Sequence, residues 1–83
     1  MTHQALYELA DREIQLGIFD RALMAEAMQE AAGVEANAQQ IYWRLRASTV
    51  TSLAQELSAE EREEFFRDLE LRVEARERPG PFG

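Results

Sequence analysis

One acidic side chain stands out, because Glu13 falls within the apolar stripe of a predicted helix. On a helical wheel it lies between Leu6 and Leu9. A carboxylate without a partner in that position would be costly, so we expect Glu13 to pair with Arg46, with Arg44 as the second candidate. The alternative role, a catalytic acid, requires a second suitable polar group, and the sequence places none nearby. We therefore predict a structural ion pair between Glu13 and Arg46.

The other side chains that could take part in catalysis lack suitable neighbours. His3 is the single histidine and lies near a chain end, without a nucleophile beside it. Four hydroxyls occupy a predicted helix that carries no base, which favours helix packing over nucleophilic catalysis. They belong to Ser48, Thr49, Thr51 and Ser52. The chain has no cysteine, which excludes a disulfide, a thiolate zinc site and a cysteine nucleophile. We expect no catalytic residue, no cofactor and no enzymatic activity.

A run of carboxylates at Glu60, Glu61, Glu63 and Glu64 has the spacing of one helical face. Such a set could hold a divalent cation weakly. Acidic residues in the first turn of a helix also interact favourably with the helix dipole while remaining solvated. We favour this second interpretation and expect no metal site.

The charge balance restricts the class of partner. Sixteen acidic residues against nine basic residues give the 83-residue chain a net charge of −7. This charge disfavours attraction to DNA or RNA, so we do not expect a nucleic acid partner. No segment approaches the roughly 18 apolar residues of a membrane span. Glu8 and Asp11 also interrupt the region where a signal peptide would be apolar. We expect a cytoplasmic protein without a membrane segment.

The spacing of apolar residues by three and four predicts an all-α fold. The intervening residues are mostly strong helix formers, and proline is absent before Pro79. We expect a small helical bundle with a long third helix, in one domain over residues 1–78, followed by a flexible tail at 79–83. The fourth helix is expected to pair with the end of the third. The predicted helices span residues 3–16, 21–32, 35–57 and 59–78.

Residues with known capping preferences mark the predicted helix ends. Thr2 and Asp20 are suited to begin the first and second helices. Ser58, followed three residues later by a glutamate, forms a capping box that begins the fourth. Gly17 and Gly33 are each expected to end a helix in the left-handed conformation.

The third predicted helix has a second apolar face, which carries Trp43 and Val50. If the fourth helix covers this face, both side chains belong to an ordinary core. If it does not reach Trp43, an exposed tryptophan beside arginine is typical of an interface hot spot. Small domains without disulfides often gain stability by self-association. The predicted partner or dimer interface consists of Trp43, Val50, Leu53, Leu57, Phe65, Phe66, Leu69 and Val73.

These features predict a non-enzymatic protein–protein interaction or regulatory module that forms a homodimer through its third and fourth helices. An adaptor and a small inhibitor of a larger protein both fit this description. The alternative is a nucleic-acid-binding regulator that uses Arg44 and Arg46 beside Trp43. Two arginines on an acidic chain are a weak electrostatic signal for that alternative, and Tyr42 and Leu45 are needed in the core.

Residues 5–47 resemble a pattern found in small bacterial helical domains, with glycine-terminated, alanine-rich helices. This chain has Met24 where such domains usually carry tryptophan, and Val34 where they carry an acidic residue. The resemblance implies a three-helix unit, often an appendage of larger bacterial proteins, and it implies no particular activity. The fourth helix lies outside it. The matching residues are Ala10, Glu13, Gly17, Asp20, Leu23, Ala25, Ala27, Glu30, Ala31, Gly33, Ala38, Tyr42, Leu45 and Arg46.

Overall fold

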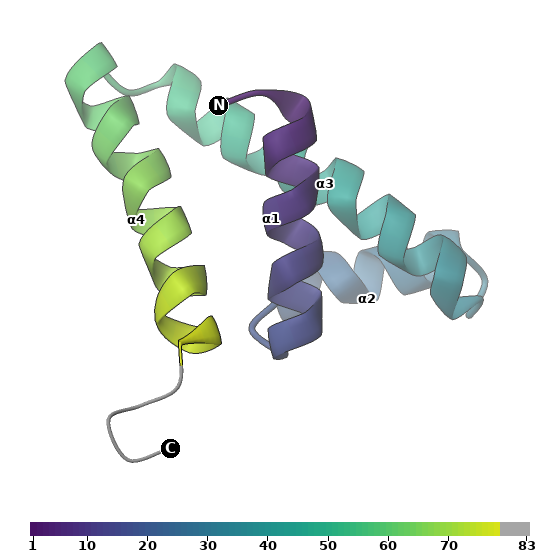
Figure 1. Ribbon diagram of the computed structural model, residues 1–83. Coiled ribbons are helices and arrows are strands. Elements are labelled where there is room, and N and C mark those ends of the chain that lie inside the picture. The colour runs from purple at the N-terminus through teal and green to yellow at the C-terminus, as the bar shows by residue number, and fades with distance from the viewer. Residues whose placement is uncertain (79–83) are drawn as a thin grey trace.

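The computed structural model describes residues 1–78 as four α-helices, which confirms the all-α class (Figure 1). The tail predicted at 79–83 lies outside the described residues. None of the helices in residues 1–78 is long and apolar enough to cross a membrane. The third helix is the longest, as predicted. The helices are α1 (His3–Leu16), α2 (Arg21–Glu30), α3 (Glu35–Gln55) and α4 (Ala59–Glu77).

Three of the four helices begin at the capping residue that the sequence predicts. The side chains of Thr2 and Asp20 each accept a hydrogen bond from the backbone N–H three residues later. At the start of α4, Ser58 and Glu61 satisfy each other's backbone N–H groups in a capping box. Helix α3 begins after Val34, which supplies no side-chain hydrogen bond. Local hydrogen bonds therefore define the starts of α1, α2 and α4.

Helices α1 and α2 end in the same hydrogen-bond pattern, but at different kinds of residue. Gly17 is left-handed at φ 73°, and the N–H after it donates to the carbonyl of Glu13. In α2 the equivalent left-handed residue is Ala32, at φ 52°. The N–H of the next residue, Gly33, donates to the carbonyl of Met28 in the same pattern. Gly33 is left-handed as predicted, at φ 82°, but the left-handed residue that ends the helix comes one position earlier, and α2 ends two residues before its predicted end.

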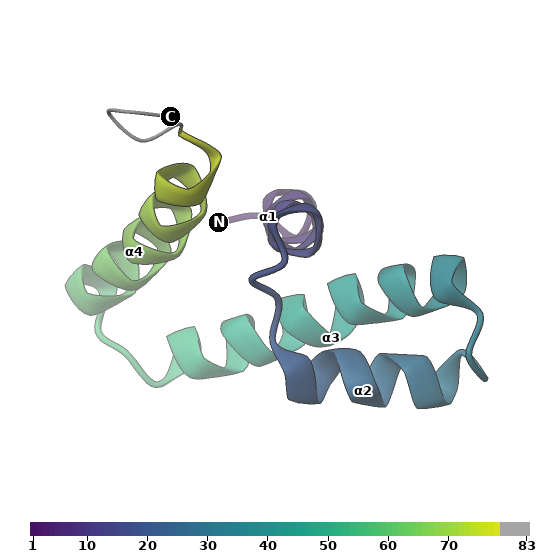
Figure 2. The same ribbon diagram turned by 90° about the horizontal axis from the view of Figure 1, so that it is seen from below.

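The helices are arranged around α3. Helices α2 and α3 form an antiparallel hairpin, and α1 crosses the middle of α3 (Figures 1 and 2). Helix α4 turns back from the end of α3 and runs beside α1, in the same direction (Figure 1). The sequence predicted that α4 would pair with the end of α3. In the structure it packs against both helices, because α1 also occupies the surface that α4 reaches.

Two groups of buried side chains form the core. The first contains Ala10, Ala27, Ala31, Ala38 and Tyr42, and the partly buried side chains packed on it all come from residues 14–45. The second contains Leu6, Ala47 and Val50, covered in part by Tyr7, Phe65, Phe66 and Leu69. Within α4, Val73 alone is buried. The first group is therefore built without α4, and only the second depends on it.

Candidate functional site

The buried polar cluster of the described chain is centred on Glu13, which is 2% exposed. Arg46 donates from Nε to Oε1 and from Nη2 to Oε2 of this carboxylate, both at 3.0 Å. The hydroxyl of Tyr42 donates to Glu13 Oε1 at 3.2 Å and accepts from the backbone N–H of Asp20 at 2.9 Å. The structure thus brings together the two residues predicted to pair, and the cluster joins α1, α3 and the start of α2.

Two members of this cluster, Tyr42 and Arg46, have raised pKa values. Burial, which disfavours a phenolate, raises the pKa of Tyr42 to about 12, despite the hydrogen bond from Asp20. Burial opposes the charged form of Arg46, but its hydrogen bond to Glu13 and the charge of that carboxylate outweigh it and raise the pKa. A neutral phenol and a permanent cation cannot exchange protons near pH 7. The arrangement therefore stabilises helix packing and is unsuited to acid–base catalysis.

The raised pKa of Tyr42 predicts a loss of stability at alkaline pH. A phenol in the unfolded chain titrates near 10, whereas the folded pKa is about 12. The unfolded chain therefore loses its proton first, and the free energy of unfolding should fall between these values by at most about 1.4 kcal/mol per pH unit. Chemical denaturation followed by circular dichroism at pH 9 to 12 would measure this slope.

The Tyr42→Phe variant is the control for that experiment. It removes the titrating hydroxyl while keeping the ring, so its unfolding free energy should be lower at pH 9 and nearly flat up to pH 12. An equal alkaline slope in the variant and in the natural chain would assign the loss to other groups.

The other side chains considered for chemistry have structural contacts. Thr49 donates to the carbonyl of Leu45 at 2.8 Å, within its own helix. The ring of His3 packs edge-on to Tyr7, with 6.1 Å between ring centres. The carboxylate of Glu61 accepts a hydrogen bond from the Ser58 backbone N–H, as part of the cap of α4. This hydrogen bond lowers the pKa of Glu61. Within residues 1–78 no group of three or more acidic, histidine or cysteine side chains is arranged to hold a metal ion.

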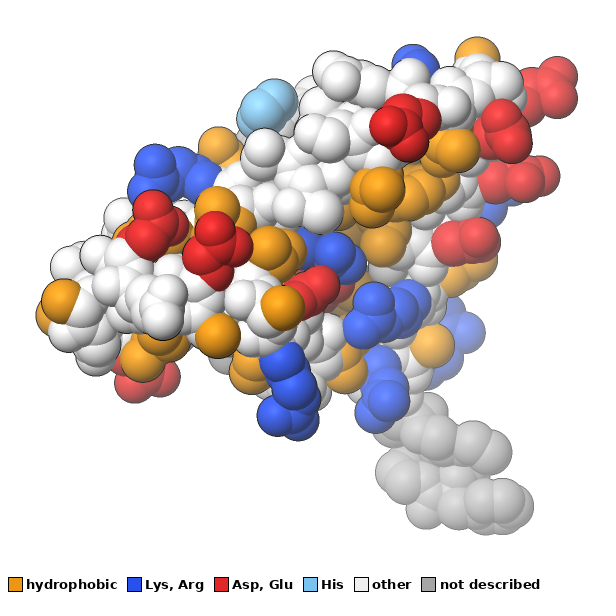
Figure 3. Space-filling model, turned by 180° about the vertical axis from the view of Figure 1, so that it is seen from behind, with side chains coloured by type: hydrophobic (Ala, Val, Ile, Leu, Met, Phe, Trp, Pro, Cys, Tyr) orange, Lys and Arg blue, Asp and Glu red, His pale blue; other side chains and the backbone are white. Residues whose placement is uncertain are grey.

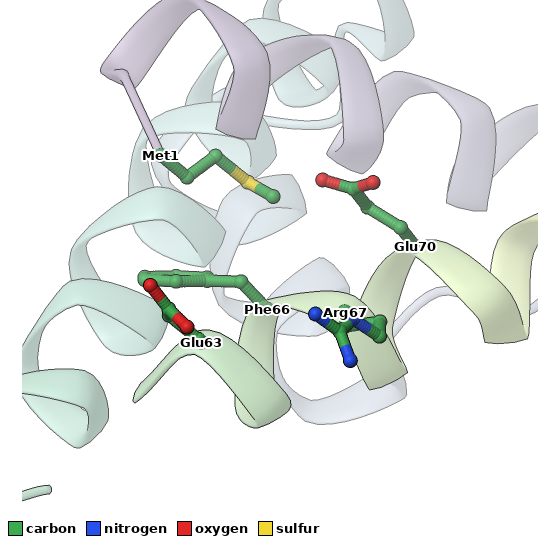
Figure 4. A pocket seen from close by; sticks show the side chains of 5 residues that line it. All are labelled: Met1, Glu63, Phe66, Arg67 and Glu70. Atoms are coloured by element: carbon green, nitrogen blue, oxygen red, sulfur yellow. The ribbon is translucent and has the colours of Figure 1, made fainter. Parts of the chain in front are cut away.

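A hollow of about 440 Å³ lies where the start of the chain meets α4. In Figure 4 Met1 and Phe66 face each other across it, with Glu63, Arg67 and Glu70 around the edge. These side chains are two apolar groups, two carboxylates and one guanidinium. The hollow places Phe66, a residue of the predicted interface, on the α1 side of α4.

Two residues of the predicted interface belong to the interior of the chain, and a third is partly buried. Val50 and Val73 are 2% and 1% exposed, which corrects their assignment to a partner surface. Trp43 packs against the first core group, and its indole N–H is buried without an acceptor. The reason is the crossing of α1 over the middle of α3, which covers the face that carries both Trp43 and Val50.

The remaining predicted residues leave apolar surface at the junction of α3 and α4. Leu53 is 49% exposed, while Leu57, Phe65 and Leu69 are partly exposed. Figure 3 shows hydrophobic side chains gathered where the second half of α3 meets α4, with arginine side chains nearby. We call Leu53, Leu57, Phe65 and Leu69 the α3–α4 patch.

Besides the partly buried apolar side chains that pack on the second core group, α4 makes polar contacts at its surface. Arg12 forms an ion pair with Glu77. Arg72 donates to the carbonyl of Ile18 at 3.0 Å, and Arg62 donates to two carbonyls at the end of α3. Solvent-exposed pairs of this kind contribute little to stability, typically about 0–1 kcal/mol. A helix of 19 residues with one buried side chain is thus weakly anchored within its own chain.

Comparison of the chain with protein-family models, with curated proteins and with solved structures finds no match. The resemblance of residues 5–47 to bacterial helical domains therefore stays a prediction.

Proposed function

We propose that this protein is a non-enzymatic protein–protein interaction module that self-associates through the α3–α4 patch. The observation that carries the proposal is the incomplete burial of the apolar side chains around α4. Leu53 is half exposed, the other three residues of the patch are partly exposed, and α4 fully buries one side chain. Contiguous apolar surface on a small protein favours contact with another protein.

A second copy of the chain is a suitable occupant of this patch. Helix α4 carries arginines and glutamates interspersed along its length, so two antiparallel copies can place opposite charges around a shared apolar centre. Self-association would also add buried surface to a domain whose own core is small. In this proposal the dimer acts in the cytoplasm as an adaptor or as a small inhibitor of a larger protein.

The alternative of a nucleic-acid-binding regulator has less support. Arg46 is occupied by Glu13, and its side chain is 15% exposed. Trp43 is partly buried and packs against the first core group, so only part of its ring is left for a ligand. Arg44 remains exposed, but one arginine on a chain of charge −7 gives little attraction to phosphates. We therefore retain the interaction module as the proposed function.

Two matched leucines provide a mutational test. Leu53→Glu introduces a charge into the α3–α4 patch, whereas Leu71→Glu introduces the same charge on the far side of α4 from Val73. Leu53 and Leu71 are 49% and 52% exposed, so neither change should disturb the core. In sedimentation velocity we expect Leu53→Glu to weaken the dimer at least about tenfold, since a desolvated charge costs more than 1.4 kcal/mol.

The Leu71→Glu variant should sediment as the natural chain does. Circular dichroism of both variants would verify that their helical content is unchanged. If Leu53→Glu dimerises as well as Leu71→Glu does, the α3–α4 patch is not the interface.

A further inference from the structure

A small pocket between α1 and α3 combines aromatic and acidic side chains. It has a volume of about 160 Å³ and is lined by Gln4, Tyr7, Glu8, Asp11 and Trp43. The four α1 residues lie on successive turns of one face, while α3 supplies the tryptophan. The pocket and the α3–α4 patch share no residue.

The acidic side chains of this pocket are not neutralised by the chain itself. Within residues 1–78 the ion pairs are Arg12 with Glu77 and Arg46 with Glu13. Glu8 accepts one hydrogen bond, from the neutral amide of Gln4 at 3.3 Å. Two carboxylates therefore stand beside two aromatic side chains without a cation from the described chain.

We propose that this pocket binds the guanidinium group of an arginine side chain supplied by a protein partner. Aromatic faces attract cations, and arginine is the residue that most often makes this contact. A planar guanidinium can also stack on an aromatic ring while its N–H groups donate to carboxylates such as Glu8 and Asp11. The pocket volume suits a side-chain head group and is too small for a helix or a folded element.

The indole of Trp43 is suited to adjust to such a ligand. Its N–H is buried but has no hydrogen-bond acceptor within the described residues. No polar contact therefore holds the ring in one orientation, unlike Tyr42, whose hydroxyl both donates and accepts. The negative net charge of the chain favours the approach of a basic partner.

This inference rests on the proposed role as an interaction module, but it concerns a surface other than the dimer interface. Trp43 is the single tryptophan of the chain, so the tryptophan fluorescence reports on the surroundings of this one side chain. We would titrate the full chain with N-acetyl-arginine amide and, separately, with N-acetyl-citrulline amide, which has the same shape without the charge. We expect a saturable fluorescence change with the arginine amide and none with the citrulline amide.

Variants at the carboxylates test the location of the site. The double variant Glu8→Gln with Asp11→Asn should weaken binding of the arginine amide about tenfold, as expected for the loss of two charged partners near the surface. Asp68→Asn, an exposed position on α4, removes a charge elsewhere and should leave the affinity nearly unchanged. Circular dichroism would verify that all variants keep the fold.

Two results would overturn the inference. One is an equal response to the arginine and citrulline amides, and the other is an equal affinity in the double variant and in Asp68→Asn. An absent response to the arginine amide in the natural chain counts against it as well. Sedimentation of the same double variant separates this inference from the proposed function, because self-association through the α3–α4 patch does not involve Glu8 or Asp11.

Discussion

Replacement of Arg46 by methionine is expected to lower the free energy of unfolding by about 3–5 kcal/mol. The change leaves the carboxylate of Glu13, which is 2% exposed, without its cation. The hydroxyl of Tyr42 is then its remaining hydrogen-bond donor. Domains of this size have a total stability of about 5–15 kcal/mol, so the variant should be close to unfolding. Urea denaturation followed by circular dichroism would measure the difference.

The double variant Glu13→Leu with Arg46→Met distinguishes the cost of an unpaired buried charge from the cost of poorer packing in the core. Both replacements are apolar and of similar length to the natural side chains, and together they remove the two charges. We expect the double variant to be within about 1–2 kcal/mol of the natural chain, because apolar replacement of a buried pair is often nearly neutral. If Arg46→Met alone lowers the free energy of unfolding by less than about 1 kcal/mol, the carboxylate of Glu13 is not buried as the structure shows.

Replacement of Val73 by aspartate is expected to release α4 while the rest of the chain stays folded. Val73 is 1% exposed and is the one buried side chain of α4, so an ionised carboxylate there should cost several kcal/mol. The first core group contains no α4 residue, and the Glu13–Arg46 pair lies between α1 and α3. Helices α1, α2 and α3 can therefore keep their packing when α4 detaches.

Far-ultraviolet circular dichroism would measure this partial release. The four helices hold 14, 10, 21 and 19 residues, so fraying of a detached α4 removes up to about 30% of the helical signal. Leu71→Asp is the control, because it changes an exposed leucine of the same helix. Complete unfolding of Val73→Asp, or a signal equal to that of Leu71→Asp, would show that α4 is not a separable element.

The features that the sequence predicts correctly are those that depend on local spacing. Thr2, Asp20 and Ser58 bond to N–H groups three residues away, so their role as caps can be read from neighbouring residues. Glu13 was predictable because a charge within an apolar stripe needs a partner, and few arginines were placed to supply it. The two side chains do meet, at 3.0 Å.

The interface, which it predicts partly wrongly, depends on how the helices cross. A helical wheel places Trp43 and Val50 on one face of α3, but it does not show that α1 covers this face. The interface prediction included Val50, which lies on this covered face, and Val73, which is the buried side chain of α4. The stop of α2 was displaced because a left-handed alanine at Ala32 precedes Gly33, and alanine is normally a poor choice there.

The correction leaves a smaller and better-defined surface for a partner. Leu53, Leu57, Phe65 and Leu69 remain partly or half exposed around a helix that is weakly held by its own chain. The combination explains how one small domain can be stable yet retain apolar surface. The buried pair and the first core group hold α1, α2 and α3 together, whereas α4 depends on contacts that a second copy can supplement.

Sedimentation equilibrium of the natural chain is the most direct measurement of self-association. Over a concentration series from about 1 μM to 1 mM, which spans the affinities usual for modest interfaces, we expect the average mass to rise from that of one chain toward that of two. The average mass of the Leu53→Glu variant should stay near that of one chain over the same range. A natural chain that keeps the mass of a monomer at every concentration would contradict self-association through the α3–α4 patch.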